Sequence, residues 1–180
     1  LLEKKGYDPM AYRLFCLQSH YRRNLVFNWE NLDNAAAAYD KLIAKIAALK
    51  NEGEVDPAAF DAMKARFVGA LDADLNTSLA LTAVYDVLKA KCSDATKLAA
   101  LRDFDRVLSL NLLAAAEKLQ KKQAQEEAAN ADPEIDALVA ARTAAKKAKN
   151  YAEADRIRDE LKARGIEIID TPQGAKWRKV

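Results

Sequence analysis

Signals that begin helices recur along this chain, and they restrict its fold more than any other feature. Three of the four prolines directly follow an aspartate, at residues 8–9, 56–57 and 132–133. Aspartate caps the free N–H groups of a helix's first turn, and proline fits the first helical position because no donor is needed there. Apolar residues at helical spacing follow these pairs and three further caps: Asn28, Asn76 or Thr77, and Asp94. The first of these helices is expected to run through about Arg22. The sequence therefore predicts a mainly α protein, an antiparallel bundle of helices joined by short polar loops.

Composition and charge limit the functional classes. Hydrophobic residues make up 51% of the 180 positions, but many of them are alanines, which favour helix while burying little area. Lysine and arginine number 29 against 27 acidic residues, so nucleic-acid binding would depend on where the charge lies. No apolar run approaches the ~20 residues of a membrane span. No signal-peptide pattern opens the chain, and we expect a cytoplasmic protein without a membrane partner.

The reactive side chains are few. Cys16 and Cys92 lie far apart and His20 is the single histidine, so the sequence predicts no zinc site and no disulfide framework, and reduced thiols are typical of cytosolic proteins. Cys16 and His20 form an (i, i+4) helical pair that resembles a nucleophile and its base. Because no third group is evident to orient the histidine, we expect both to be structural. There is no P-loop and no dinucleotide fingerprint, and no catalytic residue is predicted.

Residues 117–131 mark a predicted domain boundary. They consist mainly of Lys, Gln, Glu and Ala with almost no large apolar residue, which fits a solvated helix or a flexible tether but not core. We therefore expect residues 1–27 to precede a helical bundle at 28–116, a linker at 117–131, and a separate module at 132–180. The chain begins without methionine at what resembles a helix end closed by Gly6, which predicts a piece of a longer protein.

The last module has a mixed pattern. Short apolar stripes around residues 135–139 and 154–161 predict two helices. A β-rich run at 166–170, a Thr-Pro-Gln-Gly turn at 171–174 and a second short run at 175–179 predict a β-hairpin, with the turn of type I. The module is thus expected to be small and α+β, and to end in the hairpin.

Charge in this module is arranged in a way that suits RNA. From Pro133 to Val180 there are 11 basic residues and 8 acidic ones. Arg142, Lys146 and Lys149 share one predicted, solvent-exposed helical face, and Asp155, Arg158, Asp159 and Lys162 form the polar face of the next predicted helix. Cations meet phosphates, aromatic rings stack on unstacked bases, and carboxylates accept hydrogen bonds from base donors. The predicted tRNA-binding residues are Arg142, Lys146, Tyr151, Asp155, Arg158, Asp170, Trp177, Arg178 and Lys179. A solvated charged helix and a tryptophan in a small core would give the same pattern, and the pattern alone favours that alternative.

Several segments resemble one known family along nearly the whole chain. Residues 7–9, 12–15 and 19–22 are Tyr-Asp-Pro, Tyr-Arg-Leu-Phe and Ser-His-Tyr-Arg, and residues 27–32 are Phe-Asn-Trp-Glu-Asn-Leu. Residues 71–77 are Leu-Asp-Ala-Asp-Leu-Asn-Thr, and residues 152–178 are the most specific match. In this order and spacing they resemble the cysteinyl-tRNA synthetases, in the portion that follows the second ATP signature.

The resemblance implies the RNA-binding half of a class I synthetase. Residues 1–27 resemble the end of the stem-contact region, and the bundle and tail resemble the part that reads the GCA anticodon of tRNA(Cys). The full-length family attaches cysteine to tRNA with ATP and magnesium, and it uses zinc to select cysteine. Its His-Ile-Gly-His and Lys-Met-Ser-Lys-Ser signatures do not occur here, so the chain alone is expected to catalyse nothing and to hold no cofactor. The implied partners are tRNA(Cys) and the catalytic domain of the same chain, and the expected state is a monomer.

Two departures from the family pattern fall in the predicted site. Lys146 stands where arginine is common, which keeps charge but loses bidentate geometry, and Tyr151 stands where tryptophan is common, which keeps an aromatic face. Asp155 and Asp170 are therefore the firmer candidates for reading bases. Two alternatives stay open: a mycothiol-pathway cysteine ligase and a stand-alone helical interaction protein. The hairpin at residues 170–178 favours the synthetase.

Overall fold

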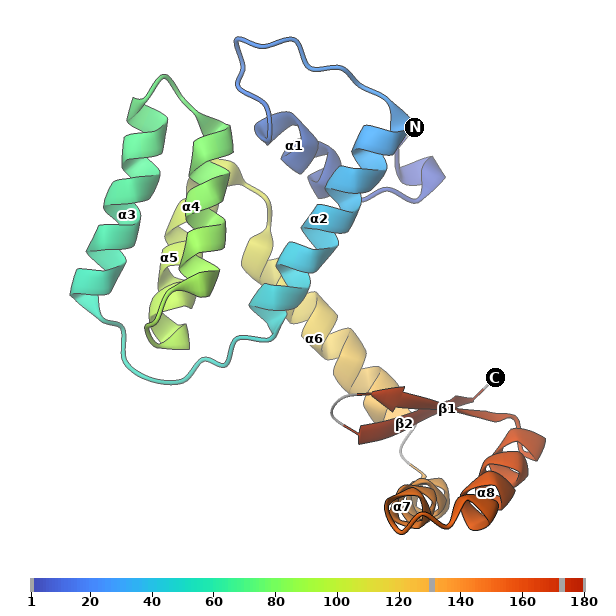
Figure 1. Cartoon of the computed structure of the whole chain (residues 1–180). Coiled ribbons are helices and arrows are strands. Elements are labelled where there is room, and N and C mark those ends of the chain that lie inside the picture. The colour runs from blue at the N-terminus through green and yellow to red at the C-terminus, as the bar shows by residue number, and fades with distance from the viewer. Residues whose placement is uncertain (1, 130–131, 172–173, 180) are drawn as a thin grey trace. The chain divides into compact units, whose positions relative to one another are not determined.

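The computed structural model describes residues 2–129, 132–171 and 174–179, and it leaves the side chains of residues 127–129, 133, 169–171, 174, 176 and 179 undescribed. Within this part the chain forms eight α-helices and two strands (Figure 1). It divides into two compact units, Leu1–Lys121 and Lys122–Val180. The mainly α prediction is confirmed.

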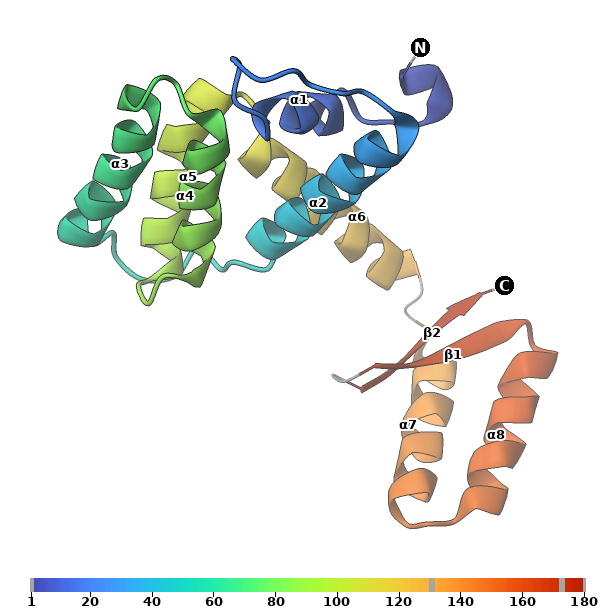
Figure 2. The ribbon, with the colours of Figure 1, turned by 45° about the horizontal axis from the view of Figure 1, so that its top comes forward.

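Within its described residues, the first unit contains helices and loops but no strand. A short 3₁₀ helix, η1, precedes the α-helices. Their bounds are Glu3–Lys5 for η1, Pro9–Leu17 for α1, Trp29–Ala47 for α2, Pro57–Asp72 for α3, Thr77–Lys89 for α4 and Asp94–Leu108 for α5, and α6 (Leu112–Ala129) begins in this unit. Figure 2 shows α3, α4 and α5 lying side by side, with α1 and α2 beside them.

The predicted aspartate caps are present. The Asp8 carboxylate accepts a hydrogen bond from the Met10 N–H at 2.7 Å, and Asp56 accepts from the N–H groups of residues 58 and 59. Two helix boundaries differ from the prediction. Ser93, and not Asp94, caps α5, since its hydroxyl accepts from the Thr96 N–H at 3.2 Å. The first helix ends at Leu17, well before the expected Arg22.

One core joins all six helices of the first unit. Phe67 of α3 and Phe104 of α5 stack within it, with ring centroids 4.1 Å apart. Tyr39 of α2 is buried, and its hydroxyl donates a hydrogen bond to the Leu110 carbonyl at 2.8 Å. The one polar group of this buried side chain therefore has a hydrogen-bond partner. Burial, together with nearby carboxylates, raises the pKa of Tyr39. The hydroxyl therefore stays protonated and serves only as a structural donor.

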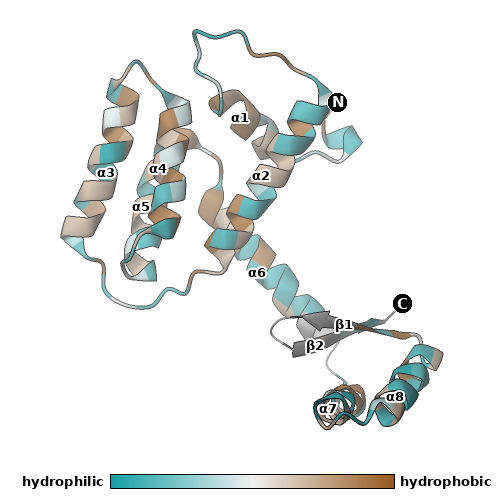
Figure 3. Cartoon of the chain, in the orientation of Figure 1, coloured by the Kyte–Doolittle hydropathy of each residue, from teal (hydrophilic) through white to brown (hydrophobic). Residues whose placement is uncertain are grey.

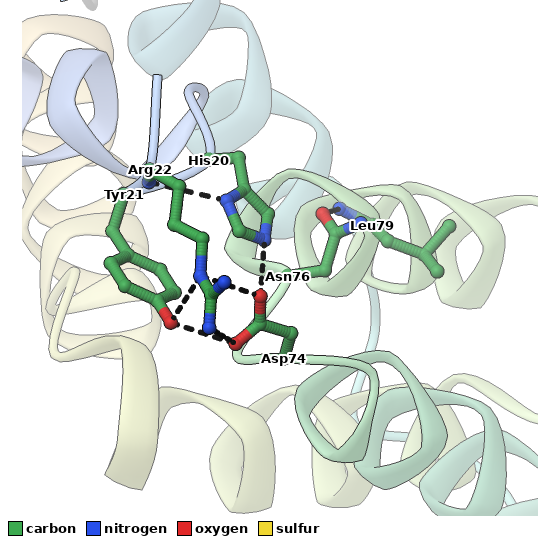
Figure 4. Close-up of polar contacts among 6 residues, drawn as sticks. All are labelled: His20, Tyr21, Arg22, Asp74, Asn76 and Leu79. Atoms are coloured by element: carbon green, nitrogen blue, oxygen red, sulfur yellow. Dashed lines mark hydrogen bonds and ion pairs between the residues drawn. The ribbon is translucent and has the colours of Figure 1, made fainter. Parts of the chain in front are cut away.

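Two of the family-like segments meet at Asp74 (Figure 4). The Tyr21 hydroxyl donates to Oδ1 of Asp74 at 2.7 Å, and Nε of Arg22 lies 2.9 Å from Oδ2. Nε2 of His20 lies 3.8 Å from the same carboxylate, while its Nδ1 accepts from the Arg22 N–H. Asp74 has a positive φ of 59°, a left-handed conformation that aspartate tolerates better than most residues. Through these contacts the Asp74 carboxylate connects the segment after α1 to the α3–α4 turn.

This geometry also corrects the expected relation of Cys16 to His20. His20 lies beyond the end of α1, so the two residues are not an (i, i+4) helical pair. The group missing from the sequence argument, a carboxylate beside the histidine, is Asp74. Cys16 packs against a separate small core of Phe15, Leu32 and Ala35.

Helix α6 contains most of the predicted linker. The Asp105 carboxylate accepts from the N–H groups of Leu110 and Leu112 at 2.7 and 2.8 Å, and so organises the start of this helix. Leu119 packs partly on the core of the first unit, and Nε2 of Gln120 donates to the Ala47 carbonyl at 2.7 Å. Beyond these residues the helix becomes hydrophilic (Figure 3). The expectation that none of this segment joins the core was therefore wrong for its first turn, and the proposed domain boundaries stay a prediction.

The second unit consists of a helix pair and a hairpin. Its elements are α7 (Pro133–Lys147), α8 (Tyr151–Ala163), β1 (Ile166–Thr171) and β2 (Gly174–Lys179). The strands are antiparallel, with Ile168 opposite Trp177. The core of this unit comprises Ile135, Val139, Ile157, Leu161, Ile166 and Trp177. The predicted hairpin is confirmed, while residues 172 and 173 of the predicted type I turn lie outside the described residues.

Candidate nucleic-acid interface

Helix α8 divides into an apolar and a polar face. Ala154, Ile157 and Leu161 are buried against the core of the second unit. The opposite face carries Asp155, Arg158, Asp159 and Lys162, which recur at three and four residues and therefore lie on one side of the helix. This is the face that the sequence predicted.

Arg158 is held between two carboxylates on this face. Its Nη1 lies 3.2 Å from Oδ1 of Asp155, and its Nε lies 3.6 Å from Oδ1 of Asp159. All three side chains are at least half exposed, at 53%, 61% and 70%. Exposed pairs of this kind contribute little to stability. The carboxylates therefore remain accessible as hydrogen-bond acceptors for a ligand.

An exposed aromatic ring lies at the start of the same helix. Tyr151 is 62% exposed and precedes Asp155 by four residues, so it occupies the neighbouring position one turn earlier. Lys146 is exposed near the end of α7, and Asn150 caps α8 by accepting from the Glu153 N–H. The α7–α8 turn thus brings an aromatic ring, a cation and a carboxylate to one region of the surface.

Arg142 departs from its predicted position. It was expected on an exposed basic face with Lys146, but it is only 6% exposed. It lines a cavity of about 660 Å³ between α7, α8 and β1. The cavity is also lined by Arg158, Asp159, Lys162, Glu167 and Ile168.

Three charged residues that line the cavity, Asp159, Lys162 and Glu167, were not among the predicted site residues. Asp159 and Lys162 repeat the spacing of Asp155 and Arg158 along α8, so their helical spacing was a usable signal. Glu167 lies on β1, and only the packing of the strand against α8 brings it to the cavity. No local pattern in the sequence marks it.

The position of Trp177 also differs from the predicted one. It was expected to present aromatic surface near the bases, but it is 8% exposed and belongs to the core of the second unit. Its Nε1–H donates to Oδ1 of Asp136 at 2.7 Å. A base needs an open ring face to stack, and the packing around Trp177 leaves none of useful size.

The remaining predicted residues lie on the hairpin. Nε of Arg178 donates to Oε2 of Glu167 at 2.7 Å, across the strand pair that places these two residues opposite each other. Asp170 and Lys179 lie in β1 and β2 by their backbones, opposite Ala175 and Ile166. The side chains of Asp170 and Lys179 lie outside the described residues.

Other charges of this unit are paired among themselves. Arg156 makes two hydrogen bonds to Glu153, and they hold the pKa of that carboxyl below its usual value. Arg164 bridges Glu134 at 2.7 Å and Glu160 at 3.0 Å. These pairs lie outside the polar face around Asp155 and account for much of the unit's remaining charge.

Among the described residues, no group of three or more His, Cys, Asp or Glu side chains is arranged to hold a metal ion. No helix in that part of the chain is long and apolar enough to cross a membrane.

The second unit belongs to a known class of RNA-binding domain. Residues 128–178, which contain the α8 polar face and the cavity, match the cysteinyl-tRNA ligase anticodon binding domain. The unit is therefore an anticodon-binding domain of the aminoacyl-tRNA ligases.

Comparison of the whole chain identifies the family. The chain is 40% identical over 187 residues to a cysteine–tRNA ligase of Novosphingobium aromaticivorans, with 99% of this chain and 37% of the relative covered. It is 36% identical to the Symbiobacterium thermophilum enzyme and 43% identical to that of Halorhodospira halophila, covering 97% and 93% of this chain and 40% and 37% of those relatives. The chain belongs to the cysteinyl-tRNA ligase family and spans about two fifths of the length of these relatives.

Proposed function

We propose that this chain binds tRNA(Cys) through its anticodon loop and supplies the RNA-recognition part of a cysteine–tRNA ligase. The observation that carries the proposal is the accessible row of Tyr151, Asp155 and Arg158 on α8, inside the segment that matches an anticodon-binding domain. An aromatic ring for stacking and a carboxylate for base donors are the groups that single-stranded RNA recognition requires.

The proposed roles follow from the chemistry of each group. Asp155, and Asp170 on β1, read bases, because a carboxylate has only acceptors and rejects a base that presents acceptors to it. Tyr151 supplies the stacking surface. Lys146, Arg178 and Lys179 meet phosphates, which sets affinity without sequence preference. Trp177 acts from the core by holding β2 in place.

We further propose that the longer protein to which this chain corresponds has the ligase activity for which its relatives are named. In this view the longer protein attaches cysteine to tRNA(Cys) with ATP and uses zinc to select the amino acid, while this part alone activates no amino acid. The described donor set offers no cluster suited to zinc, so the metal is not assigned to these residues. We also propose a monomer that acts in the cytoplasm. A mycothiol-pathway ligase or a free-standing interaction protein is less well supported, because residues 128–178 match an anticodon-binding domain.

The test is a binding titration with an anticodon stem-loop RNA and its single-base variants. Asp155→Asn replaces one acceptor with a donor and should narrow the discrimination between GCA and altered anticodons by ~1–3 kcal/mol, the scale of one good base contact. Lys146→Ala should weaken all the RNAs about equally and flatten the salt dependence. Asp61→Asn, an exposed change on α3, serves as the control. If a folded Asp155→Asn chain keeps full discrimination, Asp155 does not read a base.

A further inference from the structure

We propose that the cavity between α7, α8 and β1 holds one unstacked nucleotide of the RNA, the neighbour of those read at Asp155. This inference rests on the proposed function, but it assigns a separate subsite to residues outside the α7–α8 turn. The cavity volume of about 660 Å³ lies in the range of small-molecule sites, and it is built entirely within the second unit.

The cavity combines an apolar wall with a deep cation. Ile168 is partly buried and lines the cavity, so its side chain offers an apolar surface for the face of a base, and the buried Ile166 supports it from below. Arg142 lines it from α7 and is only 6% exposed. Its guanidinium stays charged, so it adds positive charge to the wall of the cavity. This depth distinguishes Arg142 from the solvated cations of the surface.

Two charged residues of α8 suit different parts of the nucleotide, one its phosphate and the other the edge of its base. Lys162 is exposed, lines the cavity, and has no ion-pair partner anywhere in the described part of the chain, which suits it to a phosphate. Asp159 is 70% exposed, and within the described residues its one ion pair is a 3.6 Å contact with Arg158, so its acceptors are available to a base. Glu167 is already bonded to Arg178 and therefore positions the strand side of the cavity.

Arg158 connects the cavity to the proposed reading site. It lines the cavity and also lies 3.2 Å from Asp155. Lys162 follows Asp155 by seven residues, about 10 Å along the helix. A nucleotide stacked on Tyr151 and bonded to Asp155 therefore leaves the Lys162 end of this face to the next nucleotide of the strand. Figure 2 shows α7 and α8 side by side, joined to the hairpin at the end where α8 stops.

The experiment removes the base without changing the backbone. The 180-residue chain is titrated with an anticodon stem-loop that carries an abasic nucleotide on the 5′ or the 3′ side of the triplet. One of these RNAs should bind the unaltered protein about tenfold more weakly, the scale of a single stacked and hydrogen-bonded base. Asp159→Asn should reduce this penalty to about threefold or less, whereas Asp155→Asn should leave it intact.

A second pair of measurements tests the phosphate contact. Lys162→Met should weaken the unmodified RNA about fivefold, and should have no effect on an RNA with a neutral methylphosphonate at the flanking linkage. Lys147→Met, a matched change on the part of α7 outside this cavity, should preserve both responses. Thermal melts of each variant establish that the unit is folded.

The outcomes separate this inference from the proposed function. The subsite is overturned if all the abasic RNAs bind equally well. It is also overturned if Asp159→Asn leaves the abasic binding penalty unchanged and Lys162→Met still loses affinity when the flanking phosphate is replaced by methylphosphonate. If Asp155→Asn keeps anticodon discrimination while the Asp159 coupling is present, the reading role of Asp155 fails and the subsite is supported. Failure of the unaltered chain to bind any stem-loop overturns both.

Discussion

At the scale of single residues, Trp177 holds the second unit together with both parts of its side chain. The ring packs among Ile135, Val139 and Leu161, and its N–H donates to the Asp136 carboxylate at 2.7 Å. The hydrogen bond joins β2 to α7 across residues far apart in sequence. It therefore fixes the hairpin on the helix pair, and with it the strand that carries Glu167 and Asp170.

Trp177→Phe should destabilise the second unit by about 2–4 kcal/mol. Part of this is the hydrogen bond to a charged acceptor, which contributes roughly 1.5–3 kcal/mol, and the rest is the volume lost from a small core. Urea unfolding followed by circular dichroism measures the change. The matched variant Asp136→Asn keeps an acceptor near Nε1 and should cost less than half as much. Equal stability of Trp177→Phe and the unaltered chain would show that the contact contributes nothing.

Arg142 shows what single-residue reasoning from sequence misses. Its spacing to Lys146 correctly placed both on one side of α7, and charge then predicted solvent exposure. The structure buries Arg142 because the chain returns through α8 and β1 against that part of the helix. Trp177 posed the same problem, since an aromatic residue in a hairpin fits either a stacking platform or a core, and the structure places it in the core. Neighbours supplied from distant positions decide such cases.

At the scale of elements, the capping residues made the starts of the helices predictable. The sequence did not predict where several of the helices end. Asp8, Asp56 and Asp132 all accept from the N–H groups of the helices that they precede. The end of α1 at Leu17 carries no glycine or proline signal, so the prediction ran on toward Arg22. The extent of α6 was open because a run of Lys, Gln, Glu and Ala favours helix by propensity without showing what it packs against.

Hydrogen exchange along α6 should be graded and not uniform. Amides of the first half, up to Lys121, lie where Leu112, Ala116 and Leu119 contact the core of the first unit, and they should exchange slowly. Amides from residue 123 to residue 129 lack such apolar contacts by composition and should exchange at least tenfold faster. Mass spectrometry of overlapping peptides resolves the two halves. Equally slow exchange along the whole helix would indicate packing that its sequence does not predict.

At the scale of the whole molecule, each compact unit has its own hydrophobic core. The first core draws on α1 to α6, and the second draws only on α7, α8 and the hairpin. The tryptophans are divided in the same way, with Trp29 in the first unit and Trp177 in the second, and the chain has only these two. Each ring therefore reports on one unit.

Two matched cap substitutions should reveal whether the units unfold separately. Asp56→Ala removes the acceptor of two N–H groups at the start of α3, and Asp132→Ala removes the equivalent cap of α7. Each loss should cost about 0.5–2 kcal/mol, and a cost of 1 kcal/mol lowers the melting temperature of a small domain by about 4–8 °C.

The measurement is thermal unfolding followed by tryptophan fluorescence. In a Trp29→Phe background, in which Trp177 reports only the second unit, Asp132→Ala should lower the melting temperature and Asp56→Ala should leave it unchanged. In a Trp177→Phe background the two responses should be reversed, because Trp29 then reports the first unit alone. If both substitutions shift both fluorescence transitions equally, the chain unfolds as one cooperative body, and the recognition unit cannot be treated as an independent module.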